Sequence, residues 1–309
     1  MTPDLIDLSV IVVAYRTPVA RLRSIVEAFD RAAAGSAGTA EVIVVANDPA
    51  DRYAAVDGCL LIDAGFNSGF AAATRTGLDR ARGRQVAFVN PDCVFDETSA
   101  ARLMALRPQP SEIVSPLLVD EAGHMDTGPF TSWVSSLDRH VNLRRARRFV
   151  EGVDDISGSL LPRGLKLPGA CVVMDRETAL RFGPFDPAYF LYGEDRDLCS
   201  RLRRAGGVLR LDRSFRVIHI GGESGTGAGS FVRLAQLDAE FRFAFRTLGR
   251  PGVVLVACDQ ALRSLVRPRA QVPDFVRAAR WTARRWLTRR AEAPAVDAAV
   301  LEEAVRTWR

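Results

Sequence analysis

Two acidic residues stand side by side in this chain, directly behind a group of aromatic residues. In the segment YFLYGEDRDL (189–198), Tyr189 and Tyr192 come shortly before Glu194 and Asp195. Adjacent carboxylates raise each other's pKa, and partial burial by aromatic rings acts in the same direction. Asp195 is therefore a candidate general base. The alternative is a capped helix start, because acidic side chains stabilise the positive end of a helix dipole.

A second set of candidate residues lies at the ends of two apolar runs. Asp92 closes the sequence VNPD (89–92), and His219 ends VIH (217–219), just before two glycines that let the backbone approach a ligand. Mg²⁺ and Mn²⁺ bind one or two carboxylates together with substrate phosphate oxygens, and a neutral imidazole can add a ligand. The pair therefore predicts a metal site that also holds a nucleotide diphosphate. The alternative is a turn aspartate beside a structural histidine.

A glycine-containing loop, GFNSGFAAATRTG (65–77), leads into a predicted helix. Asn67 and Gly69 lie at the junction, where free backbone N–H groups can bind an anion. Because the spacing is neither that of a P-loop nor that of GxGxxG, this loop alone is weak evidence for an anion-binding site.

The elements that position these residues alternate between strand and helix. This pattern predicts an α/β domain with a mainly parallel, Rossmann-like central sheet flanked by helices. Ligands bind such sheets at the carboxyl ends of the strands, where Asp48 and Asp92 fall. Buried apolar runs predict strands at 8–15, 41–46, 59–63 and 84–89, and helical spacing predicts helices after Pro18 and at 70–82.

After residue 98 the pattern is mixed and then becomes helical. A polar loop is expected over about 123–165, and residues beyond 229 are expected to be helical, with breaks near 249–252 and 268–273. Further strands are predicted within 112–120, 170–175 and 207–220, and a short helix at 176–183.

The C-terminal region is strongly basic. Nine arginines and one acid lie between residues 261 and 290, whereas the whole chain has a net charge of +5. The segment 274–291 predicts an amphipathic helix that either binds an anionic membrane surface or packs on the domain with its arginines in solvent. Its apolar arc consists of Phe275, Val276, Ala279, Ala283, Trp286 and Leu287. An RRARR cluster (144–148) can contact an acceptor phosphate or be solvated.

Composition and length narrow the class of protein. With 309 residues, of which 48% are hydrophobic and 26% charged, the chain is typical of a globular protein. Its five scattered cysteines indicate reduced thiols, and no secretory signal precedes the first apolar run. We therefore expect a location in the cytosol or on the cytoplasmic face of a membrane. Nucleic-acid binding is not expected, because the arginines are local and no recognition motif accompanies them.

Together these segments resemble the inverting glycosyltransferases of family 2, which have the GT-A fold, and in particular their bacterial rhamnosyltransferase-like branch. The resemblance implies a GT-A domain over 1–228, with a nucleotide-binding half over about 1–97 and an acceptor-binding half over about 98–228. A helical, basic extension follows over 229–309. The matching stretches, in the family's order, are SVIVVAY, FNSGFAAATRTGLDRARG, VAFVNPDC, LPGACVVMDRETALRFGPFDPAYFLYGEDRDLCSRLRRAGG and VIHIGGES.

The resemblance also implies a role for each candidate residue. Asp92 and His219 would bind Mg²⁺ or Mn²⁺, Asp195 would be the catalytic base, and Glu194 would orient Asp195 or the acceptor. The nucleotide sugar would contact Ala14, Tyr15, Asn47, Asp48, Asn67, Gly69, Phe70, Asn90 and Asp92. The acceptor would contact Gly169, Ala170, Tyr189 and Tyr192, with the tyrosines forming an aromatic platform.

The implied reaction is a single displacement at the anomeric carbon of a nucleoside-diphosphate sugar. The resemblance favours dTDP-L-rhamnose as the donor and a cell-envelope glycolipid or polysaccharide as the acceptor. A UDP-sugar, a GDP-sugar or a small natural-product acceptor also fits. The oligomeric state is left open, a homodimer included.

Two departures from the family pattern lie on the nucleotide side. The family commonly has Asp-Asn after the second strand, whereas this chain reads Ala46-Asn47-Asp48, and Arg75 stands where the family often has Asn. These changes keep open a non-catalytic, glycosyltransferase-like protein that binds sugar nucleotides. A metal-dependent nucleotidyltransferase is a further alternative, but it would not need the acid pair.

Overall fold

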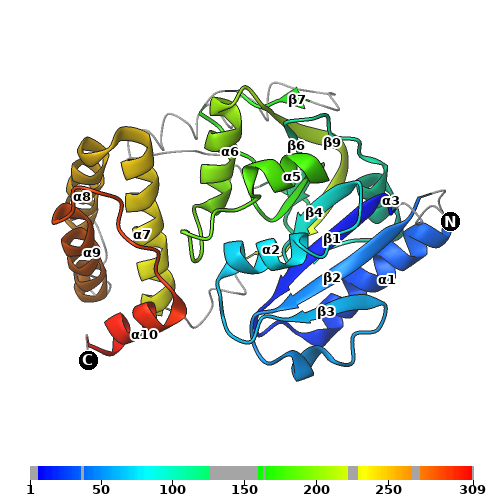
Figure 1. Ribbon diagram of the computed structural model, residues 1–309, viewed down its shortest axis with the longest axis horizontal. Coiled ribbons are helices and arrows are strands. Elements are labelled where there is room, and N and C mark those ends of the chain that lie inside the picture. Colours follow the sequence, from blue (N-terminus) through cyan, green and yellow to red (C-terminus); the bar gives the residue numbers. More distant parts are fainter. Residues whose placement is uncertain are drawn as a thin grey trace.

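The structure is a computed structural model that describes residues 6–35, 38–125, 159–162, 164–221, 229–265 and 272–307. The RRARR cluster (144–148) and most of the predicted polar loop lie outside the described residues. One sheet contains the strands β1 (Leu8–Ala14), β2 (Ala40–Ala46), β3 (Cys59–Asp63), β4 (Gln85–Val89), β5 (Cys93–Val94), β6 (Glu112–Val119), β7 (Ser159–Leu160), β8 (Cys171–Asp175) and β9 (Val208–His219). Their spatial order is β3-β2-β1-β4-β8-β6-β9-β5, and β7 pairs with β9 (Figure 1).

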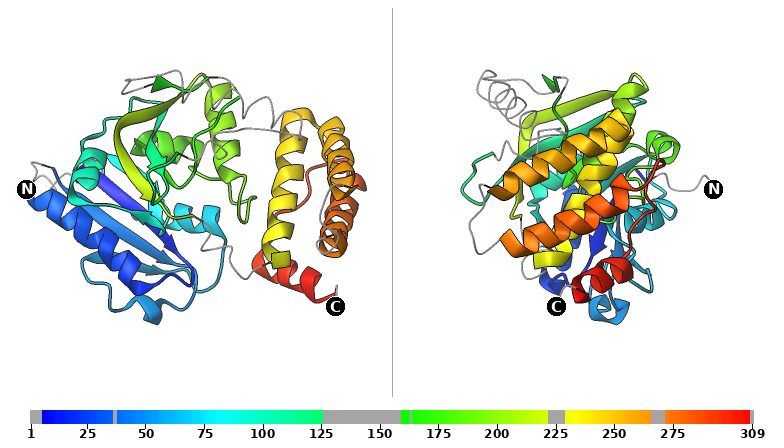
Figure 2. Two further views of the ribbon diagram at one scale, coloured as in Figure 1. Left: turned by 180° about the vertical axis from the view of Figure 1, so that it is seen from behind. Right: turned by 90° about the vertical axis from the view of Figure 1, so that its left-hand side faces the viewer.

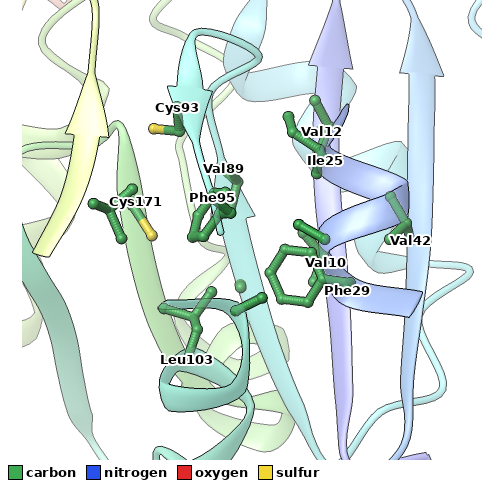
Figure 3. Packing of buried hydrophobic residues seen from close by; sticks show 14 of the residues in the cluster. Val10, Val12, Ile25, Phe29, Val42, Val89, Cys93, Phe95, Leu103 and Cys171 are labelled. Carbon is green, nitrogen blue, oxygen red and sulfur yellow. The ribbon is translucent and has the colours of Figure 1, made fainter. Parts of the chain in front are cut away.

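The N-terminal strands form the predicted parallel α/β core. β3, β2, β1 and β4 are parallel neighbours, and every residue of β1 is buried because helices cover both faces of the sheet. On one face, Ile25 and Phe29 of α1 (Val19–Gly35) pack near Val10 and Val12 of β1 (Figure 3). On the other face, α2 (Phe70–Leu78) contributes Ala71, Ala73 and Leu78 to a second cluster.

The helix α2 ends earlier than the predicted 70–82. A Cβ on Gly77 would lie 2.5 Å from Ile11 Cγ2, so the helix packs directly on β1. A Cβ on Gly83 would lie 2.5 Å from the backbone N of Ser9. The chain must therefore leave the helix before it crosses the end of β1 and enters β4.

Beyond β4 the sheet is mixed. β8 is antiparallel to β4 and β6, whereas β6 and β9 are parallel. The helix α3 (Glu97–Ala105) begins with a capping box of Asp96 and Ser99 and packs on the same face as α1. The helices α5 (Arg176–Phe182) and α6 (Glu194–Arg204) share the other face with α2. The predicted parallel arrangement is therefore found among β3, β2, β1 and β4, whereas the rest of the sheet is mixed.

The C-terminal helices form a layer beside the sheet domain. They are α7 (Gly229–Leu248), α8 (Arg250–Leu265), α9 (Val272–Leu287) and α10 (Ala298–Arg306). α7 lies next to the α/β part, and α8 and α9 lie side by side on its outer side (Figures 1 and 2). α8 approaches α7 so closely that a Cβ on Gly252 would lie 2.3 Å from Ala244 O. Within the described residues, no helix is both long and apolar enough to cross a membrane.

The buried face of α9 is rotated relative to the predicted apolar arc. Its buried residues are Phe275, Ala278, Thr282 and Trp286. Leu287, which the prediction placed on the arc, is 40% exposed. Trp286 Nε1 donates a hydrogen bond to Asp238 Oδ1 of α7 at 2.8 Å. The apolar side of 274–291 therefore packs inside the helical layer, as one of the two alternatives predicted, and is not available to a membrane.

Candidate active site

A cleft of about 630 Å³ opens at the carboxyl ends of β1, β2 and β3. It brings together four residues predicted to bind the nucleotide sugar, Tyr15, Asn47, Asp48 and Asn67. Ala14 is fully buried at the end of β1, where its carbonyl accepts a hydrogen bond from Asn47 N at 2.8 Å. The complete lining is Tyr15, Arg16, Asn47, Asp48, Pro49, Arg52, Asp63, Gly65, Phe66 and Asn67.

The carboxylate of Asp48 is bound by the chain itself. Its Oδ2 accepts hydrogen bonds from Arg16 N and Arg52 Nη1, both at 2.9 Å, and its Oδ1 accepts one from Tyr53 OH at 2.6 Å. Burial and the hydrogen bond to Asp48 raise the pKa of Tyr53 to about 12. Arg16 has a φ of 52°, a strained value for a non-glycine residue that the bond to Asp48 supports. Asp48 therefore fixes the wall of the cleft.

Asn47 holds the loop that precedes α2. Only 2% of Asn47 is exposed. Its Nδ2 donates to Asn67 Oδ1 at 3.3 Å and to Gly69 O at 3.1 Å, and its Oδ1 accepts from Ser68 Oγ at 3.0 Å. These bonds use both ends of the amide, so the side chain of Asn47 shapes the predicted donor loop from beneath.

The backbone of the same loop contacts the predicted acceptor-binding half of the domain. Phe70 N donates to Phe190 O at 3.0 Å, and a Cβ on Gly69 would lie 2.5 Å from that oxygen. Gly69 also has a φ of 83°, which favours glycine. Phe70 does not line the cleft, and its ring packs 5.3 Å from that of Phe185. Both residues thus join the two halves of the domain.

Asp92 and His219 meet, as the sequence predicts. β5 pairs with β9 so that Cys93 lies opposite His219, which places Asp92 beside the imidazole. His219 Nε2 lies 3.3 Å from Asp92 Oδ1. Burial raises the pKa of Asp92, but the neighbouring His219 outweighs burial and leaves that pKa below its ordinary value.

These two residues fit a divalent cation. Asp92 Oδ1 is buried and receives no hydrogen bond from any residue that the structure describes. Within the described part of the chain, no group of three or more His, Cys, Asp or Glu residues could hold a metal alone. Mg²⁺ and Mn²⁺ suit such a small ligand set, because water and phosphate oxygens complete their coordination. The adjacent Asn90 donates its backbone N–H to Ala170 O at 2.7 Å, which ties this strand end to the predicted acceptor turn.

Glu194 and Asp195 begin α6, as predicted. Asp195 Oδ2 forms a tight ion pair with the ammonium of Lys166 and accepts a hydrogen bond from Gly169 N at 3.2 Å. Its Oδ1 accepts one from Arg196 N at 2.6 Å. Gly169 must be small, because a Cβ there would lie 3.0 Å from Asp195 Cβ. The Asp195 side chain is 18% exposed, so a small group can reach it.

The raised pKa in this pair belongs to Glu194. Burial, followed by the charge of Asp195, raises the pKa of Glu194 to about 8. Its Oε2 is buried and has no hydrogen-bond partner among the described residues. Near neutral pH Glu194 therefore carries its proton, and Asp195 is the member of the pair that contacts Lys166.

Tyr189 does not form an acceptor platform, which corrects the prediction. It is only 1% exposed, because its ring fills the space between α6 and α7. Its hydroxyl donates to Asp197 Oδ1 at 3.3 Å, and the guanidinium of Arg246 lies 5.2 Å from the ring centroid. Phe190 is 5% exposed and equally unable to present its ring to an acceptor. Tyr189 thus contacts α6, whereas Phe190 packs in a buried cluster with residues of α7, α9 and α10.

Tyr192 remains as the exposed aromatic residue of the segment. It is 37% exposed and has a φ of 67°. Burial, followed by the charges of Glu194 and Asp92, raises the pKa of Tyr192. Backbone strain of this kind is typical of functional sites.

The prediction from sequence missed Lys166 and six of the residues that line the cleft. Lys166 pairs with Asp195. The sequence feature that could have drawn attention to it is that it is the only lysine of a chain whose other basic residues are arginines and histidines. Arg16 and Phe66 line the cleft, and Phe66 is 68% exposed. An aromatic residue inside the glycine-containing loop was the available signal for Phe66.

Comparison with known proteins gives one family match. Residues 9–148, a little under half of the chain, match the family model described as glycosyl transferase family 2. No curated protein is significantly similar to the chain in sequence.

Solved structures with a similar fold have low sequence identity. Mannosyltransferase PcManGT from Pyrobaculum calidifontis, in complex with GDP-Man and Mn²⁺, is 16% identical, with a TM-score of 0.50 over 99% of this chain and 87% of that one. S. aureus TarS 1–349 in complex with UDP-GlcNAc is 11% identical, with a TM-score of 0.50 over 88% of this chain and 79% of that one. A longer S. aureus TarS is 10% identical, with a TM-score of 0.51 over 88% of this chain. The chain spans about half the length of that TarS structure and of GalNAc-T7. These likenesses show the fold.

Proposed function

We propose that the chain is a member of glycosyl transferase family 2, and that it transfers a sugar from a nucleoside-diphosphate donor to an acceptor hydroxyl with inversion. The observation that carries this proposal is that one turn, Gly169–Ala170, contacts both sets of groups. Ala170 O accepts a hydrogen bond from Asn90 N at 2.7 Å, beside the Asp92–His219 pair with its 3.3 Å contact, and Gly169 N donates one to Asp195 Oδ2 at 3.2 Å. A donor diphosphate and an acceptor hydroxyl can therefore be held next to each other.

The residues of the chain divide the work of this reaction. Asp92 and His219 would hold Mg²⁺ or Mn²⁺, which supplies positive charge to the departing diphosphate. Asp195 would accept the proton of the attacking hydroxyl, since its side chain is 18% exposed and Lys166 and Gly169 fix its orientation. Tyr192 would contact the acceptor. The cleft at Tyr15 and Asn67 would receive the nucleotide.

The finer identity of the substrates also belongs to this proposal. We favour dTDP-L-rhamnose as the donor and a cell-envelope glycolipid or polysaccharide as the acceptor, because the motifs resemble those of rhamnosyltransferases. The structural neighbours were solved with other donors, GDP-Man and UDP-GlcNAc. Donor choice is therefore the first property to measure.

The test is release of nucleoside diphosphate from a panel of sugar nucleotides, with and without candidate acceptors. We expect one donor to be turned over in the presence of Mn²⁺ or Mg²⁺, with loss of activity on addition of EDTA. Asp195→Asn should lower kcat by about 10²–10⁴-fold, the usual value of general-base catalysis. Asp79→Asn is the matched control, since Asp79 is an exposed aspartate that pairs with Arg75.

Two outcomes would contradict the proposal. Full activity of a folded Asp195→Asn variant would leave the acid pair as a helix start without catalytic function. Binding of one donor without turnover in any acceptor mixture would favour a non-catalytic sugar-nucleotide-binding protein.

A further inference from the structure

The outward side of α8 carries a continuous row of exposed apolar residues. Val254 is 52% exposed, Leu255 42%, Leu262 65% and Leu265 79%. Cys258 is also exposed. We call these five residues the α8 stripe. At 3.6 residues per turn they fall within about 100° of one another, so they form a single strip along the helix.

The opposite side of α8 is already used for folding. Val253 and Val256 pack in a buried cluster with Phe241 of α7 and Trp286 of α9. The α8 stripe points away from this cluster and hence away from the rest of the molecule. Figure 2 shows that α8 and α9 together form the outermost side of the chain. A helix with two apolar sides is expected to be covered on both.

The exposed charged side chains of α8 and α9, within the part of the chain that the structure describes, are all arginines. Arg250 begins α8, and Arg280 and Arg284 are exposed on α9. The acidic Asp259 of α8 is partly buried and pairs with Arg263 at 2.9 Å. The outer pair of helices therefore combines an apolar strip with exposed positive charge.

We propose that the α8 stripe docks the protein onto an anionic lipid bilayer surface. Apolar side chains would enter the boundary between head groups and acyl chains, and the arginines would contact anionic head groups. A second copy of this chain is the less suitable occupant, because a two-fold contact through the stripe would bring two surfaces with exposed positive charge together. The inference extends the proposed function, since it would place the site near a lipid-linked acceptor. It also differs from the sequence prediction, which assigned membrane contact to the apolar arc of 274–291.

The test is co-sedimentation of the full chain with vesicles, which does not depend on glycosyl transfer. We expect binding to vesicles that contain phosphatidylglycerol and at least tenfold weaker binding to pure phosphatidylcholine vesicles. The double variant Leu255→Glu/Leu262→Glu should lose binding to anionic vesicles by tenfold or more. Arg280→Gln/Arg284→Gln should weaken binding and reduce its dependence on salt.

The matched control separates position from charge. Leu60→Glu/Leu180→Glu changes the net charge equally at two leucines that are 45% and 37% exposed and lie on β3 and α5. This control should bind vesicles within about threefold of the wild type. The proposal is overturned if wild type ignores anionic vesicles, or if both double variants behave alike. It is also overturned if sedimentation velocity shows a dimer that only Leu255→Glu/Leu262→Glu dissociates while its vesicle binding is unchanged. Donor turnover measured in parallel shows whether the proposed function fails separately.

Discussion

Lys166 is positioned to hold the ionised carboxylate of Asp195. It is 9% exposed and forms its ion pair at the one place where the proposed reaction needs a base. We predict that Lys166→Met lowers kcat by about tenfold or more and leaves the KM for the donor within about threefold, because loss of the cation frees the carboxylate from the orientation in which it would accept a proton. Lys166→Arg should restore most of kcat.

The separate effects on kcat and KM distinguish positioning from simple structural support. If Lys166→Met lowers only thermal stability and leaves kcat unchanged, Lys166 holds the loop and not the base. A solubility and melting check on both variants precedes the kinetics, because unpairing a buried charge destabilises proteins.

Glu194 should make the stability of the chain depend on pH. Its pKa is about 8 in the folded protein against an ordinary 4.5, so between these values the folded chain retains a proton that the unfolded chain has released. The free energy of unfolding should therefore fall as pH rises from about 4.5 to about 8. The glutamine of the Glu194→Gln variant cannot ionise. We therefore expect the free energy of unfolding of this variant, relative to that of the wild type, to be more than about 1 kcal/mol higher at pH 9 than at pH 5.

Urea unfolding at the two pH values measures this difference. Glu177→Gln is the matched control, because Glu177 is also an acid in the first turn of a helix but is exposed. An equal effect of Glu194→Gln at pH 5 and pH 9 would mean that Glu194 is ionised throughout.

Some of the site could be predicted from residue types and some could not. Asp92, His219 and Asp195 stand at strand ends and a helix start, where topology alone brings them to one edge of a sheet. Tyr189 could not be separated from Tyr192 by sequence, since burial depends on α7, which is distant along the chain. The contacts of Asp48 could not be predicted for the same reason, because its partner Arg16 follows a different strand.

At the scale of elements, one arginine links α7 to the helix that carries the acid pair. Arg246 Nη1 binds Asp186 Oδ2 at 2.7 Å and Asp197 Oδ1 at 3.3 Å, and Arg246 Nη2 binds Glu292 Oε1 at 2.8 Å. Burial lowers the pKa of Arg246, but Tyr189, Asp186 and Asp197 outweigh burial and raise that pKa above its ordinary value. The C-terminal helices are thereby fastened to α6 by charge as well as by packing.

We predict that Arg246→Met destabilises the protein by roughly 2–4 kcal/mol, because it removes a partly buried cation that Asp186, Asp197 and Glu292 share. The midpoint of urea unfolding measures the loss. Arg204→Met is the control, since Arg204 is exposed and donates a hydrogen bond to Ser200 Oγ within α6, and it should change stability by less than about 0.5 kcal/mol. Equal stability of the two variants would rule out the link.

Local patterns predicted the elements well where burial repeats regularly. The strands β1, β2 and β3 and the helix α1 follow from apolar runs and helical spacing. The end of α2 depends on a crossing of the backbone at Gly83, and the buried side of α9 depends on Asp238 of another helix. Such tertiary contacts leave no periodic trace in the sequence.

At the scale of the whole molecule, the sheet and the helical layer form one connected structure. The predicted α/β class follows from the alternation of elements in the first half, but the antiparallel β8 between β4 and β6 could not be read from that alternation. The family match covers residues 9–148, whereas Lys166, Asp195 and His219 lie beyond it. The proposed chemistry therefore joins residues inside the matched segment to residues outside it.

The backbone contact between the loop at Gly69 and the carbonyl of Phe190 bears on how relatives could be recombined. A chimera that exchanged only residues 98–228 would bring a foreign segment against a loop that fits it by main-chain atoms and a missing Cβ. Donor and acceptor modules cannot then be divided at the border of the two halves. A graft that carries residues 65–70 together with 189–193 would keep both sides of the joint, so the natural unit of exchange is discontinuous in sequence.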